Sequence, residues 1–144
     1  MGQRDLHHSV RAEVALKLQE ITSDTTTVGE EIDMDEFESL ELVIQAGTLT
    51  DGTFDVLVEE ALDDGTGSPA AFSAVADVDL LGTEALAQLV AADDDKTTKI
   101  GYLGQERFVR LSIVSTGTTS GGFLSAVGIK SHARHDVSQD SQKN

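Results

Sequence analysis

Regular alternation of apolar and polar residues is the feature that most restricts how this chain can fold. In residues 108–114 an apolar side chain occupies every second position, at Val109, Leu111 and Ile113, with polar side chains between them. This period of two predicts a β-strand with one buried face and one wet face, as in an antiparallel sheet. Together with the extended run and the glycine-containing turn just before it, the segment predicts a β-hairpin over 99–114.

The same alternation recurs along the chain and predicts further strands. Residues 37–45 and 53–60 flank an Asp51-Gly52 turn signal, which predicts a second hairpin. Short strands are also expected within 28–34, 72–81 and 123–130. About seven short strands separated by turn residues favour a single all-β domain, an antiparallel β-sandwich with a jelly-roll-like arrangement.

Two segments fit more than one structure. Residues 10–21 alternate as an extended strand does, but their apolar residues also recur at a helical spacing; the extended interpretation is favoured. In 83–92 the apolar spacing fits either a short helix with Thr83 as its N-cap or an irregular strand.

The chain divides into three parts by composition. Residues 1–20 are the least acidic part and are expected to be an N-terminal arm that docks on a partner or an edge strand of the sheet. The sandwich domain is expected over 21–131. Residues 132–144 are almost free of apolar side chains and are predicted to be a polar tail.

Charge and residue usage argue against several functions. The chain has 10 Lys and Arg against 26 Asp and Glu, and its net charge of −16 opposes binding to nucleic-acid phosphates. The absence of Cys excludes disulfides and thiolate metal sites. No apolar run approaches the ~20 residues of a membrane span, and the N-terminus has no apolar signal segment, so secretion is not expected. The acidic, lysine-poor composition also suggests a salt-rich source, where salt screens self-repulsion.

No catalytic, cofactor or metal site is predicted, and the chain is not expected to be an enzyme. The acidic clusters lack the EF-hand spacing and are expected to be solvated loops. The four histidines form two pairs near opposite ends of the chain and are expected to be surface residues, and no GxSxG elbow is present. The glycines between strands fit turns rather than a phosphate-binding loop, because none opens a helix.

Arg107 and Arg110 are rare positive charges in an acidic chain. They are expected to pair with internal acids such as Glu59 or Glu106, or to contact an acidic neighbour. The internal pairing is the favoured interpretation.

The segment around these arginines carries a resemblance to a known group of proteins. It reads Lys99-x-Gly101-Tyr102-x-Gly104-x-x-Arg107-Phe108-Val109-Arg110, and it is followed by a Gly/Thr-rich turn, Leu124-Ser125-Ala126-Val127 and His132-Ala133-Arg134-His135. Upstream, Asp51-Gly52-Thr53, the acidic loop 63–68 and Ala76-Asp77-x-Asp79-Leu80-Leu81-Gly82 fit the same pattern. Over residues 28–135 the chain thus resembles small head decoration, cement or auxiliary capsid proteins of tailed viruses of bacteria and archaea. It departs from them at Ala133, where similar chains often carry Pro.

The resemblance implies a compact β-sandwich that forms homo-oligomers, dimers or trimers, and binds the major capsid protein on the capsid exterior without a cofactor. The candidate contacts in such a role are the basic residues Arg4, Arg11, Lys17, Arg107, Arg110 and Arg134. Two alternatives remain open. One is a low-copy tail, collar, turret or spike-base component used in host attachment. The other is a lectin-like sandwich, against which the low aromatic content of 4% counts.

Overall fold

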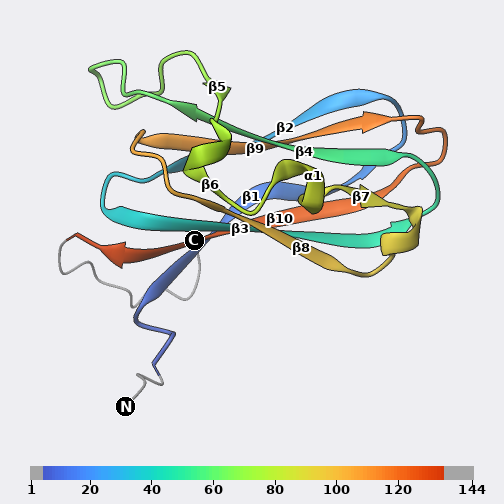
Figure 1. Cartoon of the computed structure of the whole chain (residues 1–144), viewed down its shortest axis with the longest axis horizontal. Coiled ribbons are helices and arrows are strands. Elements are labelled where there is room, and N and C mark those ends of the chain that lie inside the picture. Colours follow the sequence, from blue (N-terminus) through green and yellow to red (C-terminus); the bar gives the residue numbers. More distant parts are fainter. Residues whose placement is uncertain (1–4, 135–144) are drawn as a thin grey trace.

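Residues 5–134 are described by a computed structural model, in which two antiparallel sheets pack face to face (Figure 1). Sheet A contains, in spatial order, β1 (Val10–Ile21), β10 (Gly122–Ala133), β3 (Phe37–Leu49), β8 (Thr97–Tyr102) and β6 (Leu80–Leu81). Sheet B contains β2 (Thr25–Asp33), β9 (Phe108–Thr116), β4 (Thr53–Ala61) and β5 (Ser73–Ala74), and β7 (Leu89–Val90) also pairs with β4. The predicted all-β sandwich is confirmed.

Consecutive long strands lie in opposite sheets. The chain passes from sheet A to sheet B between β1 and β2, between β3 and β4, and between β8 and β9. As a result, the neighbours of each strand come from distant parts of the chain: β10 lies between β1 and β3, and β9 lies between β2 and β4. This interleaving of two sheets is a jelly-roll arrangement.

Both predicted hairpins are wrong. The two strands predicted over 99–114 are β8 and β9, which belong to different sheets, and the same is true of β3 and β4. In the connection between β8 and β9, the N–H of Leu103 donates to the carbonyl of Asp79 and the carbonyl of Arg107 accepts from the N–H of Met34, both at 2.7 Å. The connection is therefore bonded to other segments instead of closing a tight turn. Alternation identifies the buried side of a strand but not its partner.

The buried sides predicted for the long strands are confirmed. The inward side chains of β3, β4 and β9 fill the space between the sheets, each at most 3% exposed. They are Leu40, Leu42 and Ile44, then Phe54, Val56 and Val58, and then Val109, Leu111 and Ile113. Because the chain has few aromatic residues, the burial of Val, Leu and Ile side chains supplies most of the stabilisation of this core.

The segment between β4 and β8 departs from the expected strand over 72–81. Only β5 and β6 are extended there, and the helical turn η1 (Asp77–Asp79) separates them. Val75 and Leu80 are the buried side chains, so burial does not follow a period of two. The ambiguous segment 83–92 contains both predicted alternatives, a helix α1 (Glu84–Ala87) and the short strand β7.

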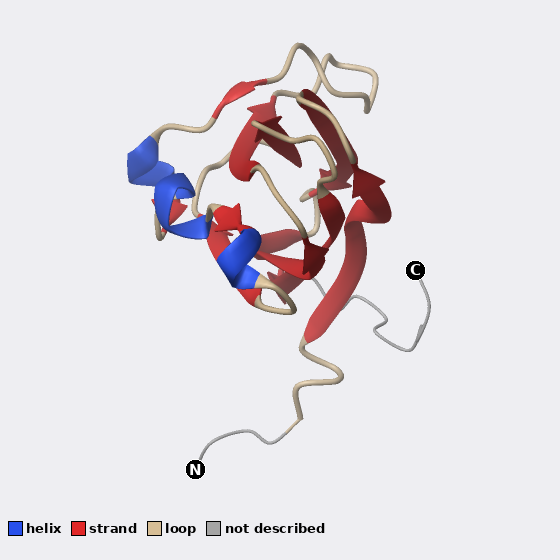
Figure 2. Ribbon diagram, turned by 90° about the vertical axis from the view of Figure 1, so that its right-hand side faces the viewer, coloured by secondary structure: helices blue, strands red, loops and turns tan. Residues whose placement is uncertain are grey.

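Helix α1 protects an edge of sheet B. Thr83 caps it as predicted, because its hydroxyl accepts from the N–H of Leu86 at 3.1 Å. The Glu84 carboxylate accepts from the N–H of Val58 at 2.7 Å, on the edge of β4 between β5 and β7. Figure 2 shows η1, α1 and the turn η2 (Ala91–Asp93) together along one side of the sandwich. Within residues 5–134, no helix is long and apolar enough to cross a membrane.

Residues 10–21 are extended and form β1, at the edge of sheet A, where they pair with β10. β1 also packs beside β2, because Gly29 lies directly against the Ala15 carbonyl and any Cβ at Gly29 would collide with it. The division into arm, sandwich and tail stays a prediction, and residues 135–144 of the tail lie outside the described range.

Candidate functional site

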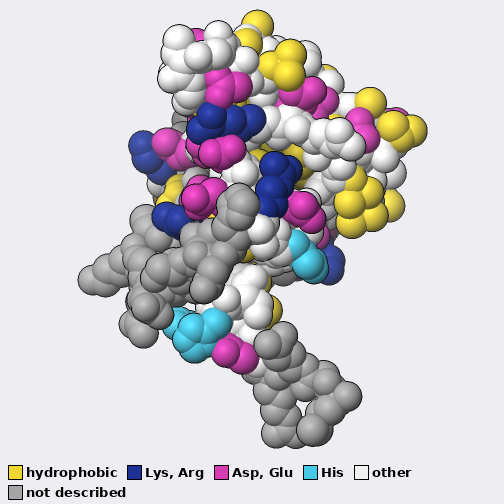
Figure 3. All heavy atoms as spheres, turned by 90° about the vertical axis from the view of Figure 1, so that its left-hand side faces the viewer, with side chains coloured by type: hydrophobic (Ala, Val, Ile, Leu, Met, Phe, Trp, Pro, Cys, Tyr) yellow, Lys and Arg dark blue, Asp and Glu magenta, His cyan; other side chains and the backbone are white. Residues whose placement is uncertain are grey.

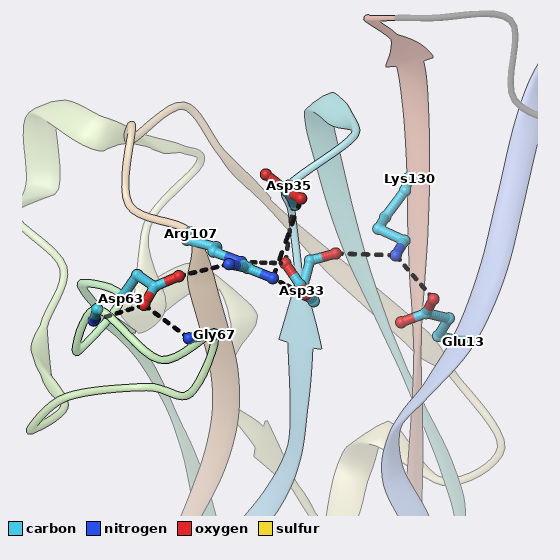
Figure 4. Close-up of polar contacts among 8 residues, drawn as sticks. Glu13, Asp33, Asp35, Asp63, Gly67, Arg107 and Lys130 are labelled. Carbon is cyan, nitrogen blue, oxygen red and sulfur yellow. Dashed lines mark hydrogen bonds and ion pairs between the residues drawn. The ribbon is translucent and has the colours of Figure 1, made fainter.

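One end of the sandwich carries a chain of ion pairs and hydrogen bonds that joins the two sheets (Figure 4). Arg107, just before β9, donates from Nε and Nη2 to the carboxylate of Asp33 at 3.0 and 2.9 Å, and from Nη1 to Asp63. On the other side of Asp33, Lys130 of β10 joins it to Glu13 of β1. We call Glu13, Asp33, Asp63, Arg107 and Lys130 the polar end.

Lys130 is the most buried charge of this group, at 4% exposure. Its Nζ lies 2.7 Å from Glu13 Oε1, donates to the carbonyl of Asp33 at 2.9 Å and is 4.9 Å from the centre of the Phe37 ring. A buried ammonium requires such partners, since desolvation without them is costly. The sequence analysis missed Lys130, because both sides of β10 carry apolar side chains and the sequence does not say which side is buried.

Two acids of the polar end, Asp33 and Asp63, are held in their ionised form. Hydrogen bonds from Arg107 are the main reason that the pKa of Asp33 lies below its ordinary value. The N–H groups of Gly67 and Gly65 do most to lower the pKa of Asp63, and Arg107 adds to this effect. In turn, Asp33 raises the pKa of Arg107. The polar end therefore keeps its charges in internal pairs.

Two open clefts flank the polar end. The larger, about 380 Å³, has an apolar floor that includes Met34 and Phe37 and a rim that includes Glu106, Arg107 and Arg134. The smaller, about 230 Å³, includes Arg11, Glu13 and Lys130. In residues 5–134 no group of three or more His, Asp or Glu side chains is placed to hold a metal ion.

The structure brings three of the predicted contact residues together at this end. Arg107 lies in the polar end, Arg134 lines the larger cleft and Arg11 the smaller one. Arg134 Nε is 3.7 Å from Glu38 Oε1, and Arg11 Nε is 3.5 Å from Glu13 Oε1.

The other predicted contacts lie elsewhere. Arg110 is on the outward side of sheet B, where it donates to Glu59 at 2.8 Å and packs 4.0 Å from the centre of the Phe72 ring. Its predicted pairing with Glu59 is confirmed, whereas Arg107 pairs with Asp33 and Asp63 instead of Glu59 or Glu106. Lys17 of β1 pairs with Glu30 of β2 at 2.9 Å. Arg4 lies outside the described residues.

The outward side of sheet A has a different character. Val14, Val127 and Val43 lie side by side across β1, β10 and β3, with Leu18 and Phe123 further along the same side. We call these five residues the apolar face. The sequence analysis found the alternation of these strands but did not identify this face as exposed, because sequence alone did not say which side of β1 and β10 faces outward.

Comparisons with protein-family models and with curated proteins find no match. Among solved structures, the chain is similar to the SPBc2 prophage-derived protein YomS, with a TM-score of 0.44 and 12% identity over 85% of this chain and 93% of that one. It is also similar to chains of the infectious bursal disease virus Gx strain (TM-score 0.46, 16% identity, 88% and 33% covered) and of a T13 particle of that virus (0.47, 15%, 85% and 31%). The chain spans about a third of those viral chains. At this level of similarity none of them assigns a function to it.

Proposed function

We propose that the chain is a structural protein of a virus particle, and specifically a decoration or cement protein that binds the capsid exterior and stabilises the head. The observation that carries the proposal is the apolar face, an exposed apolar side of a sheet on a protein whose net charge is −16. Exposed apolar side chains gathered on one surface indicate contact with another protein. The motifs in 51–53, 76–82 and 99–110 support the same class.

The fold suits this mechanical role. The two sheets enclose an apolar core, and at the polar end Lys130 of sheet A donates to the carbonyl of Asp33 in sheet B, so the body is a rigid unit. A rigid unit that touches several capsid subunits cross-links them, and many weak contacts then resist genome pressure together. Arg11, Arg107 and Arg134, which border the clefts, are the basic residues best grouped to meet a capsid subunit.

The test is the number of copies per particle, measured by quantitative mass spectrometry of purified virions against the major capsid protein. A decoration protein is expected in numbers comparable to the major capsid protein. Particles that lack the chain are expected to release their genome at a lower temperature. A handful of copies would indicate a tail, collar or spike-base component instead, and absence from the particle would contradict a virion role.

A further inference from the structure

The apolar face is exposed at the positions where a sandwich strand usually carries polar side chains. Leu18 is 73% exposed, Val14 48%, Phe123 44% and Val127 40%. The register places Val127 opposite both Val14 and Val43, so these side chains form one row across three strands. The row continues to Lys99 of β8.

This side of the sheet is also nearly free of charge. The charged residues that the register places among these positions are Glu20 opposite Phe123, Glu41 opposite Gly101, and Lys99 opposite Val43. Two acids and one base leave a net charge of −1, whereas the whole chain carries −16. The outward side of sheet B differs, because Arg110, Glu59 and Phe72 pack against one another there.

We propose that the apolar face is a self-association surface, on which the same face of a second copy of this chain packs about a two-fold axis. This assignment rests on the proposed function. It places the contact between copies of the decoration protein on the outward side of sheet A. It commits to a second copy rather than to the capsid protein for the two reasons that follow.

The first reason is charge. Two copies with a net charge of −16 repel each other, and most orientations bring acidic surfaces together. The apolar face is the side on which two copies meet with little like charge between them. The remaining repulsion acts over about 8–10 Å at moderate salt and shortens as salt is added. Association through this face is therefore expected to strengthen with salt, opposite to a contact made by ion pairs.

The second reason is area. The outward positions of β10 from Phe123 to Ser131 span about 27 Å, and four strands about 4.8 Å apart are about 19 Å wide. One copy thus offers about 500 Å² in projection, and two copies bury about 1,000 Å². This area is just below the roughly 1,200–2,000 Å² of stable specific interfaces and fits a weak, reversible contact. A reversible dimer of this size is expected.

The experiment is sedimentation velocity of the purified full chain over a concentration series, at low and at molar salt. The informative variant is Val127→Glu, because Val127 lies in the middle of the row and a two-fold interface contains it twice. The matched control is Val28→Glu, which places the same charge at another exposed valine, on β2 of sheet B. Wild type is expected to dimerise more tightly in molar salt. Val127→Glu is expected to raise the dimer Kd at least about tenfold, and Val28→Glu to leave it unchanged.

A second variant separates association from folding. Val127→Thr keeps the β-branched shape and replaces one methyl group by a hydroxyl group, so it is expected to weaken the dimer by a smaller factor while thermal unfolding stays as in wild type. A chain that stays monomeric at both salt concentrations would overturn the proposal. So would an oligomer other than a dimer, or a dimer that Val28→Glu weakens as much as Val127→Glu does. Monomeric protein whose binding to capsids is lost in Val127→Glu would assign the face to the capsid protein and overturn self-association, while leaving the decoration role intact.

Discussion

The polar end and the apolar face share two strands, β1 and β10, and take side chains from opposite sides of them. On β1, Glu13 faces the polar end and the next residue, Val14, faces outward; on β10, Lys130 faces inward and Val127 outward. Figure 3, viewed from the polar end, shows Lys and Arg side chains next to Asp and Glu side chains there. Alternation therefore gives each strand two roles, one that joins the sheets and one that leaves an apolar surface exposed.

The difference shows how this acidic chain uses its few basic residues. Four of its ten Lys and Arg residues gather at the polar end or its clefts, and each lies within 4 Å of an acid of the same chain. They are Arg11, Arg107, Lys130 and Arg134. Arg11, Arg107 and Arg134, which the sequence analysis assigned to partner contacts, are thus already paired with acids of the same chain, so a capsid subunit would meet them as paired charges. The apolar face, by contrast, is exposed and nearly free of charge.

The largest effect on stability is expected at Lys130. Lys130→Ala leaves Glu13 and the Asp33 carbonyl without their shared cation, and we expect a loss of about 3–5 kcal/mol in the free energy of unfolding. Urea unfolding at neutral pH measures it. Lys130→Met is the control, because its chain still packs on Phe37 and should lose less than Lys130→Ala. A loss below about 1 kcal/mol for Lys130→Ala would mean that the polar end does not join the sheets.

A smaller change in stability is expected to distinguish the inward side of β10 from its outward side. A Cβ added to Gly128 would lie 2.5 Å from Ile32 Cδ1 in the core, so Gly128→Ala is expected to cost about 1–3 kcal/mol of stability. Its neighbour Val127 faces outward, and Val127→Thr is expected to change stability by less than about 0.5 kcal/mol. Urea unfolding and sedimentation of both variants check this. Gly128→Ala should leave self-association unchanged, and equal stabilities of the two variants would contradict the assignment of sides.

Sequence reasoning was successful where a pattern depends on local geometry. The period of two in β3, β4 and β9 identified the buried side chains, and Thr83 indicated a helix start as one of two alternatives, since both features follow from residues close together in the chain. It failed for pairing. The strands flanking Gly104 read as a hairpin, but a turn residue permits a tight turn without requiring one, and the chain crosses to the other sheet instead.

The candidate site was harder to predict for the same reason. Arg107 is 74 residues from Asp33, and Lys130 is 97 residues from it, so only the jelly-roll order brings them together. The signals visible in the sequence were limited to rare basic residues, which indicated that Arg107 and Arg110 have internal partners but not that Asp33 is one. The burial of Lys130 depends on which side of β10 faces sheet B, and that is decided by neighbours distant in sequence.

The smallest predicted effect concerns the acid sensitivity of the polar end. Because Arg107 lowers the pKa of Asp33 below its unfolded value of 3.8, the pair stabilises the fold fully above that pH and loses its contribution as pH falls through the folded pKa. Asp33 is half exposed, so the contribution is expected to be below about 1 kcal/mol. Asp33→Asn keeps the oxygen that accepts from the N–H of Asp35, removes the charge, and replaces the oxygen that accepts from Arg107 Nη2 by an NH2 group. It should therefore be less stable than wild type at pH 7, and the difference should vanish at strongly acidic pH.

Urea unfolding of both proteins across this pH range measures the difference. The Arg107→Met background is the control. Without the guanidinium, Asp33→Asn should change the pH dependence less, because only the N–H of Asp35 and the charge of Lys130 then lower the pKa of Asp33. If Asp33→Asn alters that dependence equally with and without Arg107, the charge of Asp33 acts through other groups. The polar end would then be a set of separate contacts, and only Lys130 would join the two sheets there.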